Sequence, residues 1–429
     1  MTEELADRRQ PPVTPAATPA DPTPTSPPAY KAGRIRGLDG PRGVACWAVL
    51  IVHVANQCSP DTMAKGGLAL LGQALIFFFA LSGFLLYLPY VRALLQHKQT
   101  QPDTRAYVIH RLLRVFPGYL VIFLIVNFAL QASFLHNEWA SSHTGTDAGT
   151  GMITDPGQLA TNLTLLQSYF PHYLQTGISP SWSLTLELVF YACLPVFGAA
   201  MWFLRRRFGT NLAALVLAPP AILIVLGIAG KVLAAWLTER AGITTTIEAN
   251  WGPNWAAVVL RSFVASSDNF AFGMLATVVF VAVGVGMIDA RRVRPIRVAA
   301  IIAIVPSLLI MLVLIAAGSN FQSTFTALAS GLLILIIVLP MAAGGDSVFA
   351  RALDWRPLEY LGRISLSIYL WHFPVIIVLI RLGVLQGDSW AGLAVNIVAC
   401  SAVSFALASV TFHFVEKPAM TYARRFKVR

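Results

Sequence analysis

Most of the chain consists of apolar segments that are each long enough to cross a lipid bilayer as a helix. A spanning helix needs ~17–25 predominantly apolar residues, and about ten segments of the chain satisfy that length. Lipid offers no hydrogen-bond partners, so a spanning segment must satisfy its own backbone groups, as a helix does. The pattern therefore predicts an all-α, polytopic membrane protein. The expected segments lie near 39–57, 67–93, 106–134, 179–204, 211–237, 267–288, 296–317, 322–344, 360–382 and 389–416.

The composition supports the same class of protein. Charged residues make up 12% of the 429 residues and hydrophobic residues 56%, whereas soluble domains carry about 25% charged residues. The net charge of +11 indicates anchoring at the cytoplasmic face, and nucleic-acid binding is not expected. The four cysteines form no close C-x-x-C pair, so neither a disulfide framework nor a metal site is expected. The sequence carries no indication of oligomeric state.

The loops between the apolar segments alternate in charge. Every second loop carries several Lys or Arg residues, while the long loop 135–178 contains none. Cytoplasmic loops of membrane proteins are enriched in these cations. We therefore expect about ten transmembrane helices with both termini in the cytoplasm, and a plasma-membrane location in a bacterium.

Three regions follow from these patterns. Residues 1–35 are rich in Pro, Thr and Ala and have few large apolar side chains, so we expect a disordered cytoplasmic tail. Residues 36–418 form the transmembrane domain, and residues 419–429 form a basic cytoplasmic tail. The first segment is expected to act as an uncleaved signal. The outer loop 135–178 is either a lid or acceptor-binding surface, or a spacer.

The first apolar segment carries an arginine at its start and a histidine about three turns later. Arg42 and His53 are eleven residues apart, which places them within about 20° of one helix face and about 16 Å apart in depth. Ionisable groups inside a membrane usually face a bundle interior or a wet cavity. The segment either forms one wall of a polar pocket or contains a histidine bonded to a neighbouring helix.

The third segment opens with two arginines on one face. Arg111 and Arg114 are i,i+3 neighbours, so both guanidinium groups point the same way at the cytoplasmic edge. Forked donors suit phosphate groups. The facing pair favours an anionic ligand, and ordinary anchoring or contact with anionic membrane lipids is the alternative.

Two further segments contain polar residues near their middle or start. Ser82 and Gly83 lie within the second segment, where small residues let helices approach closely. Ser183 and Glu187 are i,i+4 neighbours at the start of the fourth segment. An intramembrane carboxylate is a functional candidate by default.

The ninth segment carries a polar stripe. Ser365, Tyr369 and His372 fall at i, i+4 and i+7, and such a stripe must face protein or water. It is either a structural hydrogen-bond ladder or part of a catalytic site. Glu416, at the end of the last segment, is expected to pair with an arginine, and Lys231 is expected to extend its ammonium group to the outer surface.

Five motifs, taken in order, resemble the membrane-bound acyltransferase family 3. They read LDGPRGVACWAVLIVH, FFFALSGFLL, RLLRVFP, SWSLTLELVFY and SLSIYLWHFP. The resemblance extends from Arg36 to Pro418, although Pro41 stands where an aliphatic residue is usual. It implies transfer of an acyl group, commonly acetyl, from cytoplasmic acyl-CoA to a hydroxyl. The implied acceptors are glycans, glycolipids or small hydroxylated molecules, and we expect no appended esterase-like domain.

The resemblance also assigns residues to the site. It implies that Arg42 and His53 are the catalytic pair, and we add Glu187 as a group that could orient the histidine. The arginines at 111 and 114 become donor-binding residues. The expected pocket residues are Ser82, Ser183, Tyr369 and His372.

Other functions fit parts of this pattern. A secondary transporter for a polyanionic or amphiphilic substrate would also need midplane polar groups and basic gates, but the hydropathy shows no internal repeat. An acyltransferase acting on a cytosolic metabolite is another alternative. The sequence also leaves open whether transfer is direct or passes through an acylated His or Ser.

Overall fold

The computed structural model describes residues 35–137, 149–209, 211–345 and 347–426. The expected disordered tail therefore lies outside the described residues apart from Ile35, as do residues 138–148 of the long loop and residues 427–429 of the basic tail. The described chain is almost entirely helical, and its only strands are β1 (Ser133–Phe134) and β2 (Thr150–Gly151), which pair antiparallel.

The helices run in the following order. The first half contains α1 (Asp39–Cys58), α2 (Pro60–Gly66), α3 (Ala74–Leu95), α4 (Thr104–Leu124), α6 (Pro156–Leu163), α7 (Trp182–Phe208), α8 (Leu212–Arg240), α9 (Thr246–Trp251) and α10 (Trp255–Leu260). The second half contains α11 (Phe263–Gly284), α12 (Val293–Ala316), α13 (Gln322–Ala342), α14 (Val348–Leu353), α15 (Arg356–Arg363), α16 (Ser365–Arg381), α17 (Trp390–Thr411) and α18 (Lys417–Ala423).

Eight helical stretches of the described chain are long and apolar enough to cross a membrane, and the bent pair α15–α16, with 74° between its halves, makes a ninth. All nine coincide with expected segments, which confirms an all-α polytopic membrane protein. The remaining expected segment is α1, which has 20 residues but also carries Arg42, His53 and Asn56. These polar residues lower its hydropathy, so α1 is not among the nine.

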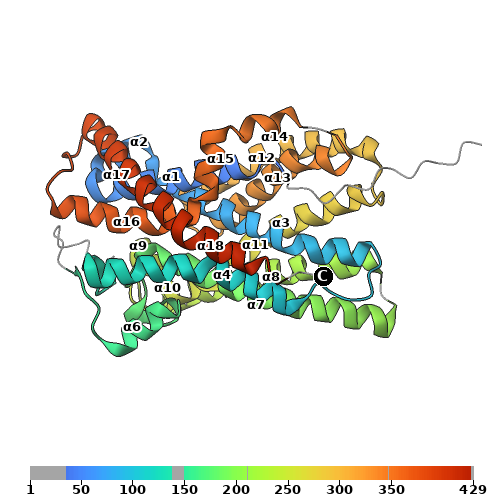
Figure 1. The fold of residues 1–429 in the computed structure, drawn as a ribbon, viewed down its shortest axis with the longest axis horizontal. Helices are drawn as coiled ribbons and strands as arrows, with labels where there is room; N and C mark the ends of the chain where they lie inside the picture. The colour runs from blue at the N-terminus through green and yellow to red at the C-terminus, as the bar shows by residue number, and fades with distance from the viewer. Residues whose placement is uncertain (1–34, 138–148, 210, 346, 427–429) are drawn as a thin grey trace, which may run out of the picture.

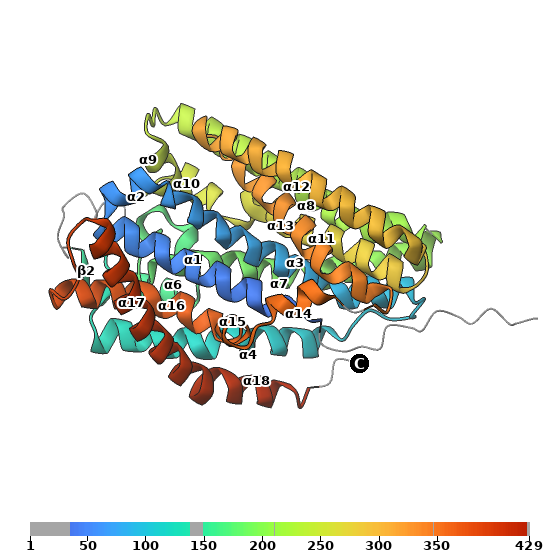
Figure 2. The same cartoon turned by 90° about the horizontal axis from the view of Figure 1, so that it is seen from above.

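The helices form a bundle in which the span that contains α11 is the most buried of the candidate spans in the described chain. Figure 2 shows α8 and α12 along one long edge, α18 along the opposite edge and α1 between them. Helix α11 packs against α3, α8 and α13. In its most apolar stretch, 78% of the residues are buried within the protein, against 17% for the stretch that contains α12. The short helices α6, α9 and α10 gather at one end of the bundle (Figure 1).

The ends of these short helices are fixed by side-chain caps. Asp155 accepts a 2.6 Å bond from the backbone N–H of Gln158 at the start of α6, and Pro156 occupies the first helical position. Asn254 does the same for Ala257 at the start of α10, at 2.9 Å. Such caps satisfy backbone donors that a helix start leaves unpaired.

Close contact between α3 and α11 depends on glycine. A Cβ atom on Gly83 would lie 2.0 Å from the carbonyl oxygen of Phe270, and one on Gly273 would lie 1.7 Å from that of Ala80. The expected role of the small residues in the second segment is therefore confirmed. The approach also lets the Phe79 and Phe270 rings meet, with centroids 5.0 Å apart.

We predict that Gly83→Ala lowers the thermal stability of the detergent-solubilised protein, because the added methyl group must push α3 away from α11. Overpacking of this kind costs about 1–3 kcal/mol. Gly72→Ala is the matched control, since no atom lies within 4 Å of its added Cβ. Equal melting temperatures for the two variants, measured by loss of monodisperse protein on heating, would contradict the packing argument.

Candidate functional site: two cavities that share a wall

The first cavity is lined by cations and has a volume of about 150 Å³. We call it the basic cavity. It lies between α1, α3, α4, α7 and α16, and its polar lining consists of Arg42, Ser82, Arg111, Arg114, Ser183, Glu187, Tyr191, Ser365 and Tyr369. The sequence analysis had singled out eight of these nine residues, and the structure brings them together.

Two of the three arginines are held in place by neighbouring helices. Arg42 donates to the hydroxyl of Ser365 on α16 at 3.2 Å and lies 3.5 Å from the carboxylate of Asp39. Arg114 donates to the buried carboxylate of Glu416 at 3.2 Å, so the expected pairing of Glu416 is confirmed. These contacts fix the two guanidinium groups at the cavity.

Arg111 differs from the other two arginines. Its Nε is buried and has no hydrogen-bond partner in the described chain. A buried donor without an acceptor is costly, so native proteins usually supply a partner. The cavity therefore presents a fixed positive surface with an unfilled donor, which suits an anionic ligand.

Glu187 is engaged within the same cavity. Its carboxylate accepts a 3.2 Å bond from Ser82 on α3 and a 2.6 Å bond from Tyr191 one turn further along α7. Sequence reasoning overlooked Tyr191, although its i,i+4 spacing from Glu187 places both on one helix face. The carboxylate lines the basic cavity, whereas His53 lines a different one.

The second cavity is larger, about 570 Å³, and we call it the histidine cavity. It takes residues from the C-terminal half of α1, among them His53 and Asn56, and extends to α8, α9, α11 and the start of α13. Leu75, Phe79 and Tyr369 line both cavities. The two cavities therefore follow one another along α1 and share a wall.

His53 contacts the other histidine of the predicted site. Its Nδ1 lies 2.9 Å from Nε2 of His372, and Nδ1 of His372 lies 3.3 Å from the carbonyl oxygen of Ile368. A carbonyl only accepts, so Nδ1 of His372 carries a proton; with both rings neutral, its Nε2 then accepts from Nδ1–H of His53. This arrangement leaves Nε2 of His53 as an unprotonated acceptor. His53 lines the cavity, and His372 is buried behind it.

The rest of the polar stripe on α16 also faces protein. The hydroxyl of Tyr369 donates to the carbonyl oxygen of Pro180 at 2.7 Å and accepts from Ser183 at 2.8 Å. Ser365 accepts a bond from Arg42, and His372 bonds to His53. Every member of the stripe therefore bonds to another helix or loop. Each member of the ladder is therefore hydrogen-bonded, and Ser365 and Tyr369 also line the cavities.

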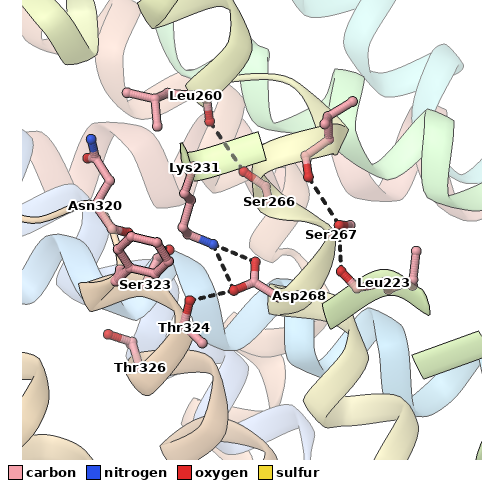
Figure 3. Close-up of polar contacts among 12 residues, drawn as sticks. Leu223, Lys231, Leu260, Ser266, Ser267, Asp268, Asn320, Ser323, Thr324 and Thr326 are labelled. Carbon is pink, nitrogen blue, oxygen red and sulfur yellow. Dashed lines mark hydrogen bonds and ion pairs between the residues drawn. The ribbon is translucent and has the colours of Figure 1, made fainter. Parts of the chain in front are cut away.

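Lys231 does not extend to the outer surface as expected. It is buried, with 2% of its surface exposed, and its ammonium lies 2.7 Å from both carboxylate oxygens of Asp268 on α11 (Figure 3). Asp268 is 0% exposed. A fully buried carboxylate within reach gives the ammonium a better partner than a distant interface, so the pair forms across α8 and α11.

We predict that Lys231→Met and Asp268→Leu each destabilise the protein by about 3–5 kcal/mol, because each leaves one buried charge without its partner. The double variant replaces the pair by apolar side chains of similar volume and should lie closer to wild type than either single variant. Thermal midpoints in detergent provide the comparison. Additive effects of the two substitutions would show that the pair is not coupled.

The structure defines a multi-pass membrane protein with two cavities between its helices that are lined in part by polar side chains. The described residues include no group of three or more His, Cys, Asp or Glu side chains that could hold a metal ion. Comparison with protein families gives the class. The family described as an acyltransferase domain matches residues 35–413. The chain belongs to this family, which confirms the resemblance of its motifs.

Two relatives are bacterial. The chain is 25% identical over 399 residues to peptidoglycan O-acetyltransferase OatA of Listeria monocytogenes, a match that covers 91% of this chain and 56% of the relative. It is 31% identical over 101 residues to a putative peptidoglycan O-acetyltransferase, YrhL, of Bacillus subtilis, covering 24% of this chain and 14% of the relative. The chain thus spans little more than half the length of the first relative. No solved structure matches the chain.

Proposed function

We propose that the protein is a membrane O-acyltransferase that moves an acetyl group from acetyl-CoA to a hydroxyl of a glycan. The observation that carries the proposal is the shared wall of Leu75, Phe79 and Tyr369 between a cation-lined cavity and a cavity that contains a histidine acceptor. A donor and an acceptor substrate can then approach one boundary from two sides. The names of the two relatives support a glycan acceptor.

The donor binds in the basic cavity. CoA is a polyanion confined to the cytosol, and the cavity offers Arg42, Arg111 and Arg114. Charge-assisted bonds from guanidinium groups are the natural means of holding phosphates. This assignment requires the cavity to open to the cytoplasm, in agreement with the Lys and Arg pattern of the loops.

His53 is the general base. The acceptor hydroxyl loses its proton to Nε2 of His53 as its oxygen attacks the thioester carbonyl, since a free hydroxyl is a poor nucleophile near neutral pH. The tetrahedral intermediate then expels the CoA thiolate, which takes up the proton. His372 acts as a positioning residue, because its acceptor nitrogen fixes the tautomer of His53 at 2.9 Å.

Glu187 acts away from the histidine. Its bonds to Ser82 and Tyr191 place its carboxylate in the basic cavity, which Arg42 also lines. We assign it to the orientation of the donor-side arginines, in place of the orientation of His53 that the sequence suggested.

We predict that Arg111→Ala raises the KM for acetyl-CoA about 10- to 150-fold, as expected when a charge-assisted bond of about 1.5–3 kcal/mol is lost. The KM for the acceptor should change little. Arg105→Ala is the matched control, since Arg105 is exposed on the same helix and lines neither cavity. An unchanged donor KM in folded Arg111→Ala protein would refute the donor assignment.

We predict that His53→Ala lowers kcat about 10²–10⁴-fold, the usual loss on removal of a general base, while acetyl-CoA still binds. His372→Ala removes only the group that orients His53 and should cost less. Steady-state kinetics together with equilibrium binding of acetyl-CoA separates the two roles. A near-normal kcat for His53→Ala with a large loss for His372→Ala would move the base to α16.

A further inference from the structure

The histidine cavity has a second polar wall, formed by residues that the proposed chemistry does not use. Lys231 of α8, Asn269 of α11, Asn320, which precedes α13, and Ser323 of α13 all line it. Figure 3 shows Lys231, Asn320 and Ser323 grouped beside Asp268. Lys231, Asn269 and Ser323 lie within candidate membrane spans, where polar groups without partners are costly.

Lys231 is rigidly held and has donor capacity left. Asp268 accepts two of its bonds at 2.7 Å and is itself fixed by the hydroxyl of Thr324 at 2.5 Å. Gly227 on α8 leaves room for the carboxylate, because a Cβ there would lie 2.6 Å from its oxygen. An ammonium group has three N–H donors, and the third has no acceptor among the described residues.

Asn269 supplies an acceptor that also lacks a partner. Its side chain is 2% exposed, and its Oδ1 has no hydrogen-bond partner in the described chain. Asn250, elsewhere on the lining, has a second buried Oδ1 without a partner. Buried amide oxygens are normally satisfied by protein, water or ligand. Two of them in one cavity indicate that this space takes a ligand rich in hydrogen-bond donors.

The charges of the lining narrow the ligand class. The described lining contains Lys231, Arg261 and His53, and no Asp or Glu. A cationic ligand therefore finds no carboxylate at the surface of the cavity. A hydroxyl group both donates and accepts, so a molecule with several hydroxyls can satisfy the amide oxygens and the free donor of Lys231 together.

We infer that Lys231 and Asn269 form a sugar subsite that binds the non-reacting hydroxyls of the acceptor. The inference rests on the proposed function, since it takes the histidine cavity as the acceptor side. Lys231 and Asn269 are specificity-determining residues in this arrangement. Asp268 and Thr324 are positioning residues, because they act on the ligand through Lys231.

The experiment compares two ligands with the same ring and the same primary hydroxyl. Methyl β-D-glucopyranoside carries secondary hydroxyls, and tetrahydropyran-2-methanol carries none. Their dissociation constants for the purified full-length protein are measured by ligand-observed NMR titration. Wild type should bind the glucoside more tightly. Asn269→Ala should weaken glucoside binding about 3- to 10-fold, equivalent to one net hydrogen bond, and leave tetrahydropyran-2-methanol unchanged.

Two further variants complete the experiment. Ser330→Ala is the matched control, because it removes a buried hydroxyl of α13 that bonds only within its own helix and lines neither cavity. The double variant Lys231→Met with Asp268→Leu avoids an unpaired buried charge and should also weaken glucoside binding selectively.

Equal affinity of wild type for the two ligands, or unchanged glucoside affinity in both Asn269→Ala and the double variant, would overturn the subsite. The polar groups of Lys231 and Asn269 would then bind water only. The proposed function has a separate readout, transfer of labelled acetyl from acetyl-CoA to hydroxyls. Binding preference without transfer would therefore count against the proposed function and leave the subsite standing.

Discussion

The site depends on the contact between α1 and α16. Arg42 bonds to Ser365, and about three turns deeper His53 bonds to His372. Within a membrane the polar groups of a helix must find partners in protein or in trapped water. Two ladders of polar residues on adjacent helices meet this requirement together. Because hydrogen bonds form at both ends of this contact, the register of α1 against α16 is fixed. The depths of Arg42 and His53 in the bundle are fixed with it.

The class of fold could be predicted from the sequence because lipid imposes it. Nine expected segments coincide with candidate spans, and their apolar length was sufficient information. The start of the sixth segment was placed too late, at 267 instead of Phe263, where α11 begins. The four residues before position 267, Phe263–Ser266, are helical in the structure, and three of them are buried.

The members of the site could be predicted more readily than their grouping. Helical spacing identified Arg42, His53 and the stripe on α16, since it reports which residues share a face of one helix. It does not report which faces of different helices meet. Glu187 was therefore placed beside His53, whereas Ser82 and Tyr191 hold it in the other cavity. Lys231 was misplaced for the same reason, because its partner lies on a helix far away in the sequence.

The shared wall of the two cavities has a consequence for the cell that contains this protein. If the two polar cavities along α1 were joined, water and protons would pass through the protein. The proton gradient across the membrane would then be dissipated. Leu75, Phe79 and Tyr369 border both cavities, and the tyrosine hydroxyl is tied to Pro180 and Ser183. Two apolar side chains and one hydrogen-bonded ring thus stand at the boundary between the cavities. These three side chains therefore also have to limit the passage of water and protons between the two cavities.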